Sequence, residues 1–415
     1  MRHNLLRFIT TAALTLAAVV VLGQNKSAGI NLSLWNKIST QPINPAQKTY
    51  FNLGIVSAQN KLRGFSLNLL SNQVDGDAYG AQLVGLANVV GEKSTGLQVA
   101  GVANVIGEYS NGVTIAGLGN MVGESQHGVS LAGLINLIGI DSKGLSVAGL
   151  GNAIGYNSIG VAVGGVFNII GDDMIGLGLA GLLNITDNTY GLSASGLINI
   201  AQNTTGLSFA PFNINSNNFY GLQAGLANIN TNRFYGLQLG LLNVGIVHKG
   251  LQLGLVNYYN ESLTGFQLGL INLNPDTKVS ILAYGGNRTK LNIAARFKNR
   301  LFYNIIGIGS PYLKFSDKFS GTINYRAGIY LPLAKNLEIS GDLGYQHINT
   351  FSNKNKEEGI AKRMYGLQAR VNLEYLFTSK WSIIATGGYE TTRWYSKSKT
   401  YRKGTLVEGG IAYTI

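Results

Sequence analysis

The sequence predicts an all-β protein, and three observations carry that prediction. Glycine accounts for 56 of the 415 residues, which disfavours long helices because a glycine in a helix interior costs about 1 kcal/mol. A short phrase of the form GLxLxGLxN recurs along residues 64–275. In residues 276–415 polar and apolar residues alternate, which is the period of a β-strand with two different faces.

Residues 1–23 have the pattern of a secretory signal peptide. Two arginines accompany an apolar run from Phe8 to Leu22, and small residues surround a cleavage point after Gly23. This run is short for a membrane helix, so a membrane anchor is the less favoured interpretation. We therefore expect an exported protein.

Fourteen tandem repeats occupy residues 64–275, after an N-terminal region of residues 24–63 with two expected strands. Each repeat opens with a glycine and carries an asparagine seven or eight residues later. From Gly206 onward the segment is one residue shorter, and a β-bulge in the longer form is the expected adjustment. Every charged residue between Gly64 and Leu273 lies in an asparagine-to-glycine connector. The chain therefore alternates between uncharged segments and charged connectors.

Two all-β architectures suit these repeats. In the favoured one each uncharged segment crosses a membrane as a tilted strand, and all strands form one antiparallel meander barrel of about 24 strands, an outer-membrane β-barrel. In the alternative each repeat is one coil of a β-solenoid with stacked asparagines, joined to a C-terminal eight-stranded barrel. The constant period and Pro211 inside a segment favour the coil. Against it, residues such as Ile135 and Phe167 would point outward and expose a long apolar wall.

The alternation of polar and apolar residues in the last third of the chain predicts amphipathic barrel strands. Charged residues within these strands all lie on one face, as expected for an outer-membrane barrel with a polar interior and a lipid-facing exterior. A water-soluble sheet with one wet face shares this alternation. The predicted interior charges are Arg326, Glu338, Asp342, Arg370 and Glu374. They would line a selective pore or hold a small barrel closed, and we favour the closing role.

The phrases GLQLGLLN, GLQLGLVN and GFQLGLIN, followed by RLFYNIIGIG and amphipathic strands, resemble the tandem Gly-Leu/Asn surface-repeat proteins of Bacteroidota and spirochaetes. The resemblance covers residues 50–310 and implies an outer-membrane or surface protein, without catalytic residues to carry over. The expected function is a non-enzymatic outer-membrane barrel with a channel or structural role. The alternative is a surface-exposed repeat protein for adhesion or interaction, anchored by the C-terminal barrel.

Catalytic, cofactor and metal sites are not expected. The absence of cysteine excludes thiolate chemistry and Cys-based metal sites. The four histidines have no metal-ligand spacing, so we expect isolated surface positions. The segment GLGLAG at 176–181 has the spacing of a dinucleotide-binding loop but belongs to the repeat register.

The net charge of +13 is concentrated in the last third. The basic residues there lie mostly between expected strands: Lys354, Lys356, Lys362, Arg363, Lys380, Arg393, Lys397, Lys399, Arg402 and Lys403. They suit either ordinary solvated loops or contact with anionic lipopolysaccharide. The expected partners are outer-membrane lipid, lipopolysaccharide and the barrel-assembly machinery, and nucleic acid is not expected.

Overall fold

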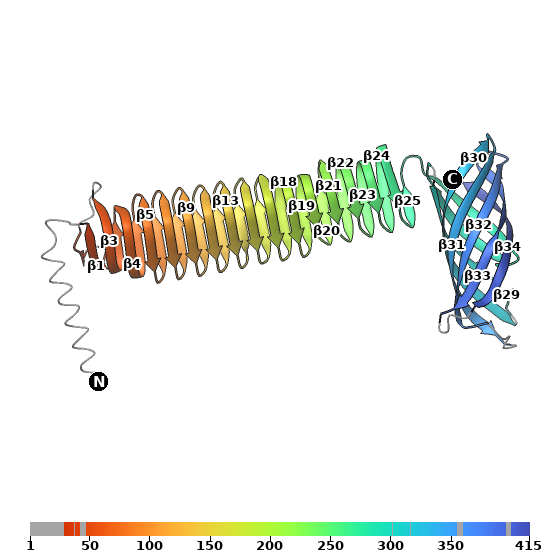
Figure 1. The fold of residues 1–415 in the computed structure, drawn as a ribbon, viewed down its shortest axis with the longest axis horizontal. Coiled ribbons are helices and arrows are strands. Elements are labelled where there is room, and N and C mark those ends of the chain that lie inside the picture. The colour runs from red at the N-terminus through yellow and green to blue at the C-terminus, as the bar shows by residue number, and fades with distance from the viewer. Residues whose placement is uncertain are drawn as a thin grey trace. The chain divides into compact units, whose positions relative to one another are not determined.

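The computed structural model describes residues 29–36, 38–41, 47–300, 302–315, 317–354, 360–395 and 400–415. The predicted signal peptide and the basic residues Lys356, Lys397 and Lys399 lie outside these ranges. All regular elements of the described part are β-strands, and they form a 25-stranded and a nine-stranded sheet (Figure 1). Among these residues there is no helix long and apolar enough to cross a membrane.

The larger sheet is a β-solenoid, so the alternative architecture is confirmed and the single barrel of about 24 strands is wrong. The barrel prediction required antiparallel pairing of successive segments, whereas the strands of the repeats pair in parallel. Each residue of β7 (Ser94–Ala100) pairs in parallel with the residue sixteen positions later in β9 (Ser110–Ala116). Likewise, β8 (Ala103–Ile106) pairs in parallel with β10 (Gly119–Val122). Each repeat is therefore one coil with a long side and a short side, and equivalent residues stack in columns.

The chain divides into two compact units, Met1–Asn232 and Arg233–Ile415. The described part of the first unit consists of coils, which begin with β1 (Ile30–Trp35), β2 (Ile38–Ser39), β3 (Lys48–Gln59) and β4 (Lys61–Val74). The next long sides are β5 (Ala78–Val84), β11 (Gln126–Ala132), β13 (Ser142–Ala148), β15 (Ser158–Gly164) and β17 (Asp173–Ala180). The matching short sides are β6 (Ala87–Val90), β12 (Ile135–Ile138), β14 (Gly151–Ile154) and β16 (Phe167–Ile170).

In later coils the connector joins the strands on both sides, which makes many of the strands longer. These strands are β18 (Leu183–Ser195), β19 (Ile198–Phe209), β20 (Phe212–Asn215), β21 (Phe219–Ala224), β22 (Ala227–Leu239), β23 (Leu242–Leu253), β24 (Val256–Leu268) and β25 (Ile271–Leu273). The segments from Gly206 onward are one residue shorter because the corner between the long and short sides has one residue fewer. The expected β-bulge does not account for the difference. Ala194 pairs with Phe209 and Ile198 with Phe212, so the shorter corner leaves the asparagine column in register.

A column of asparagines runs through the coil interior beside a column of buried aliphatic residues that includes Ile106, Val122 and Ile138. Asn136 donates through Nδ2 to Oδ1 of Asn152 at 2.9 Å, and Asn120 donates in the same way to Asn136 at 3.0 Å. The same Nδ2 of Asn136 also donates to the carbonyl of Val147 on the long side, at 3.0 Å. The asparagine column thus joins successive coils and both sides of each coil, which satisfies side chains that are fully buried.

Glycine at the corner between the two sides permits this stacking. A Cβ at Gly117 would lie 2.0 Å from the carbonyl oxygen of Gly101 in the coil before it. Gly101 and Gly133 occupy the same column, with the same close approach to the preceding coil. At these three positions a side chain is therefore excluded by the backbone of the neighbouring coil.

The second unit holds the last coils and a closed antiparallel barrel of eight strands. These are β26 (Lys278–Gly286), β27 (Leu291–Lys298), β28 (Phe302–Ser310), β30 (Lys318–Ala334), β31 (Leu337–Asn353), β32 (Arg363–Leu376), β33 (Trp381–Trp394) and β34 (Thr400–Thr414). A two-residue strand, β29 (Leu313–Lys314), lies in the loop between β28 and β30 and pairs with β30. The first strand, β26, pairs with the last, β34, which closes the barrel.

Candidate functional site

The interior of the barrel gathers the charged side chains that the alternating pattern placed on one face. Arg326, Asp342, Arg370 and Glu374 are all buried, and Glu338 is half-buried. The structure therefore brings all five predicted interior charges into the barrel. The hydrogen bonds and ion pairs of these side chains determine whether the interior is open or filled.

Arg326 and Asp342 form the centre of one cluster. The guanidinium donates twice to the carboxylate, at 2.9 Å from Nε and 2.6 Å from Nη2. The hydroxyl of Tyr303 and the amide of Asn372 donate to Asp342 as well, at 2.7 and 2.8 Å. Arg370 completes the cluster, with Nη1 3.9 Å from Asp342 and Nε donating to Glu408 at 3.1 Å.

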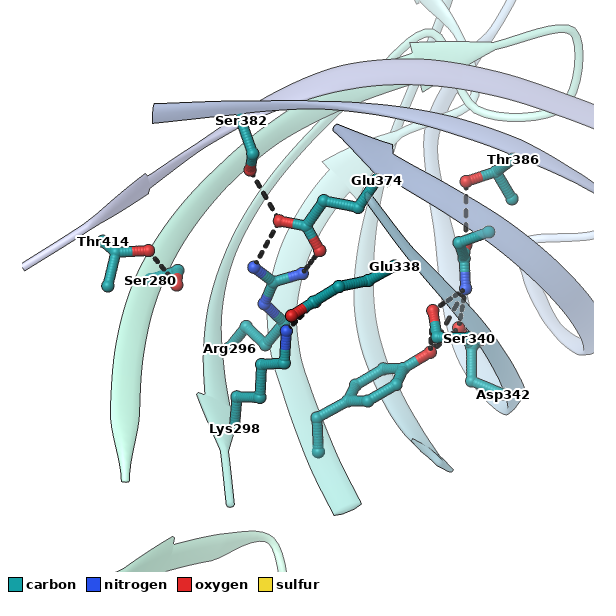
Figure 2. Close-up of polar contacts among 12 residues, drawn as sticks. Ser280, Arg296, Lys298, Glu338, Ser340, Asp342, Glu374, Ser382, Thr386 and Thr414 are labelled. Carbon is teal, nitrogen blue, oxygen red and sulfur yellow. Dashed lines mark hydrogen bonds and ion pairs between the residues drawn. The ribbon is translucent and has the colours of Figure 1, made fainter. Parts of the chain in front are cut away.

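A second cluster forms around Glu374 (Figure 2). Arg296 donates to both carboxylate oxygens of Glu374, at 2.6 and 2.8 Å, and the hydroxyl of Ser382 donates at 2.5 Å. Lys298 lies two residues after Arg296 on the same face of β27 and pairs with Glu338. Both clusters therefore pair cations with carboxylates of different strands inside the barrel.

Sequence reasoning missed four residues of these clusters, namely Arg296, Lys298, Tyr303 and Glu408. Arg296 and Lys298 carried a usable signal, because the stretch LNIAARFK alternates and places both cations on one face. Glu408 lies in the last strand and could have been found in the same way. Tyr303 carried no signal, since a tyrosine in a strand suits either face.

Little free space remains between the two clusters. The cavity between the two clusters has a volume of ≈ 20 Å³ and is lined by Tyr303, Arg326 and Glu374 among others. Such a volume holds about one water molecule. Ions and solutes would therefore have to displace the paired side chains in order to pass. In the described part of the chain no group of three or more His, Cys, Asp or Glu side chains is arranged to hold a metal ion.

One histidine contradicts the expected surface position. His248 is 0% exposed. Its ring stacks between Phe234 and Tyr259 inside the coils, with ring centroids 5.2 and 5.6 Å apart. Burial lowers the pKa of His248 to about 4, so the ring is neutral at pH 7. We expected a surface position because His248 lies in a connector of the sequence repeat. In this coil the strand continues through the connector, so some connector side chains point into the coil.

Most of the basic residues named in the sequence analysis lie at one end of the barrel. Lys354, Lys362 and Arg363 lie in or beside the connection between β31 and β32, and Arg393 and Arg402 flank the connection between β33 and β34. These two connections lie at the same end, since β31 and β33 both pair antiparallel with β32. Lys380 is the exception, because it precedes β33 at the opposite end.

Comparison with known proteins places no family name on this chain. No family model matches it, and no curated protein matches it. Solved structures similar to part of it include the N-terminal β-barrel domain of Pseudomonas aeruginosa OprF, at 10% identity and a TM-score of 0.24, covering 34% of this chain and 96% of that one. Ail, the attachment invasion locus protein of Yersinia pestis, matches at 16% identity and a TM-score of 0.21, covering 34% and 95%. Neisserial surface protein A matches at 10% identity and a TM-score of 0.21, covering 34% and 94%.

Proposed function

We propose that this chain is a non-enzymatic outer-membrane protein whose C-terminal barrel is a closed anchor for the solenoid, and not a channel. The filled interior carries the proposal, because paired charges and a cavity of ≈ 20 Å³ leave no aqueous path. Each carboxylate of the two clusters is bonded to a cation. The interior thus has the properties of a fixed support for the barrel wall.

The outer wall of the barrel supports a membrane setting. Large apolar side chains on it are 57 to 72% exposed, and they come from strands around the barrel: Ile308, Ile323, Leu343, Val371 and Val407. A soluble protein would leave this surface in contact with water at a high free-energy cost. Lipid is the solvent that suits it, with charges inside and apolar residues outside.

The lengths of the connections indicate which end faces the cell exterior. At one end the strands are joined by residues 299–301, 335–336 and 377–380, and at the other by 287–290, 311–317, 354–362 and 395–399. Outer-membrane barrels have short periplasmic turns and longer external loops. The chain enters β26 and leaves β34 at the short-turn end, so the solenoid belongs in the periplasm. This topology favours an anchored periplasmic solenoid over a surface-displayed adhesin.

The long-loop end offers a surface for lipopolysaccharide. Its basic residues suit phosphate groups. A groove of ≈ 490 Å³ on the outer wall lies at the same end and is lined by Phe315, Phe319 and Phe351 among others. A cationic rim above an apolar groove matches a lipid with a phosphorylated headgroup and acyl chains. We expect lipopolysaccharide to bind there as the barrel's outer-leaflet neighbour.

Conductance measurements test the closed-anchor proposal. Purified protein, its folding checked by heat-modifiable gel mobility, is inserted into planar bilayers. We expect no conductance steps at any applied voltage. Reproducible steps in the wild type, with an ion selectivity that changes in Arg370→Gln, would establish a channel and overturn the proposal.

Labelling of intact cells tests the sidedness. The chain has no cysteine, so single-cysteine variants report one position each. An impermeant maleimide should label Lys354→Cys on intact cells. It should label Glu124→Cys and Asp141→Cys, both in solenoid connectors, only after the outer membrane is permeabilised. Labelling of the connectors on intact cells would instead support surface display of the repeats.

A further inference from the structure

The coils of the first unit enclose a buried asparagine column and a buried aliphatic column, and they also expose many apolar side chains on the outside. Their corner between the long and short sides presents a column of leucines that are 43 to 49% exposed: Leu86, Leu118, Leu134, Leu150, Leu182 and Leu197. We call this column the leucine edge. Apolar residues continue from it onto both sides of the coil. On the short side a groove of ≈ 740 Å³ is lined entirely by apolar residues and glycines, including Val105, Met121 and Leu137.

The opposite corner of the coils carries the charges. Its connectors hold Glu92, Glu108, Glu124, Asp141, Asp172 and Asp187, and we call this corner the acidic edge. Exposed tyrosines lie at or beside it, 36 to 57% exposed: Tyr79, Tyr109, Tyr156, Tyr190 and Tyr220. Tyrosine rings between an apolar surface and a charged one are typical of a membrane–water interface.

The backbone amides at the leucine edge donate within the solenoid. The amide of Gly117 donates to the carbonyl of Ala100 at 3.1 Å, and that of Leu118 donates to Val102 at 2.9 Å. The next coil repeats the pattern, with Leu134 donating to Leu118 at 2.8 Å. Stacking thus supplies the hydrogen bonds that an irregular corner would otherwise seek from solvent. Internal satisfaction of these donors lowers the cost of burying the edge in hydrocarbon.

The depth of the apolar zone matches one leaflet. From Leu97 on the long side to Val102 at the corner the chain rises five residues, or about 16 Å. The hydrocarbon of one leaflet is about 15 Å thick, half of the bilayer core. The acidic edge would then lie at or beyond the headgroups.

We propose that the leucine edge of the solenoid is buried in the hydrocarbon of one bilayer leaflet, with the acidic edge in water. A lipid leaflet is favoured over a second protein copy because the apolar surface covers the corner and both sides, and because tyrosines border it. The sidedness in the proposed function makes this the periplasmic leaflet of the outer membrane. Burial of the edge itself depends only on the solenoid.

Spin labels on the full-length chain in phosphatidylethanolamine–phosphatidylcholine vesicles test this inference. Labels at Leu134→Cys and Leu150→Cys report the leucine edge, and labels at Glu124→Cys and Asp141→Cys report the acidic edge of neighbouring coils. A label at Val371→Cys in the barrel wall is the lipid reference. Power saturation with oxygen and with a water-soluble nickel chelate measures the environment of each label. We expect the leucine-edge labels to match Val371→Cys, with oxygen accessibility several-fold above chelate accessibility, and the acidic-edge labels to show the reverse.

The possible outcomes are distinguishable. Chelate access at the leucine edge equal to that at the acidic edge would place the edge in water and overturn the inference. Labels that are immobile and shielded from both reagents would place it against protein, which also overturns it. If the label at Val371→Cys is itself in water, the barrel anchor fails, whatever the leucine edge shows. As a second variant, Leu134→Glu with Leu150→Glu should raise chelate access of a label at Leu118→Cys toward the acidic-edge value.

Discussion

Arg326 and Asp342 form a bidentate ion pair inside the barrel, with Nη2 and Oδ2 2.6 Å apart. They lie on neighbouring strands, β30 and β31. Asp342 is also 3.9 Å from Arg370, so a single carboxylate serves two guanidinium groups. Removal of that carboxylate would leave positive charge uncompensated in a buried position.

We therefore expect Asp342→Ala to lower the free energy of unfolding by about 3–5 kcal/mol. Urea titration of the folded protein measures the change. Asp317→Ala, in the loop before β30, is the matched control and should change stability by less than about 0.5 kcal/mol. Arg326→Met combined with Asp342→Leu should cost less than Asp342→Ala, because apolar groups then replace the pair. Equal losses in the single and double variants would show that the pair itself stabilises the barrel.

The asparagine column predicts a second effect. Asn136→Ala removes the hydrogen bonds to Asn152 and Val147 and leaves buried groups without partners. The expected cost is about 1–3 kcal/mol. Thermal unfolding followed by circular dichroism compares it with Asn111→Ala, a half-buried outward position on β9. If both variants lose the same stability, the column contributes nothing specific.

Glycine at the corner predicts a position-specific penalty. At Gly117 an added Cβ would lie 2.0 Å from a backbone oxygen, whereas at Gly119 the nearest atom is 3.1 Å away. Ala103 and Ile135 already occupy the column of Gly119. Gly117→Ala should therefore destabilise the solenoid by at least about 2 kcal/mol, and Gly119→Ala by less than about 1 kcal/mol. The denaturant midpoints of the two variants measure this difference. A larger loss of stability in Gly119→Ala than in Gly117→Ala would contradict the close backbone approach at Gly117.

The buried ring of His248 predicts acid sensitivity. Its pKa is lowered to about 4 in the folded chain, against about 6.5 when unfolded. Between these values the unfolded chain binds a proton that the folded chain does not. The free energy of unfolding should thus fall by up to about 3 kcal/mol as the pH decreases from 6.5 to 4, and level off below. His248→Phe, which extends the ring stack of Phe234, should remove this dependence, and an unchanged pH profile in the variant would refute it.

Several features of the fold follow from local pattern. The repeat period and the eight C-terminal strands are visible in the sequence because each depends on the order of residues within short segments. The asparagines recur in the sequence, but their stacking across sixteen residues depends on the parallel pairing of the coils. Pro211 was a correct indicator, since it lies at a corner where no ladder hydrogen bond is required of its nitrogen. The apolar positions Ile135 and Phe167 were misleading as evidence against the coil, because they do point outward.

The interior of the barrel was only partly predictable. Alternation identifies the face on which Arg370 or Glu374 lies, but the partner comes from a distant strand. Arg296 and Glu374 are 78 residues apart and meet only when the barrel closes. Such pairings depend on strand order and register, which no local period encodes.

By itself the sequence determined that the chain is all-β, that charge is confined to connectors and to one face of the last strands, and that each repeat is one unit. The tertiary structure decided whether those units run antiparallel through a membrane or wind in parallel as coils. The physical reason is that side chains alternate with a period of two in both cases. The choice rests on the glycine corner, where the backbone of Gly117 approaches Gly101 closely enough for coils to stack.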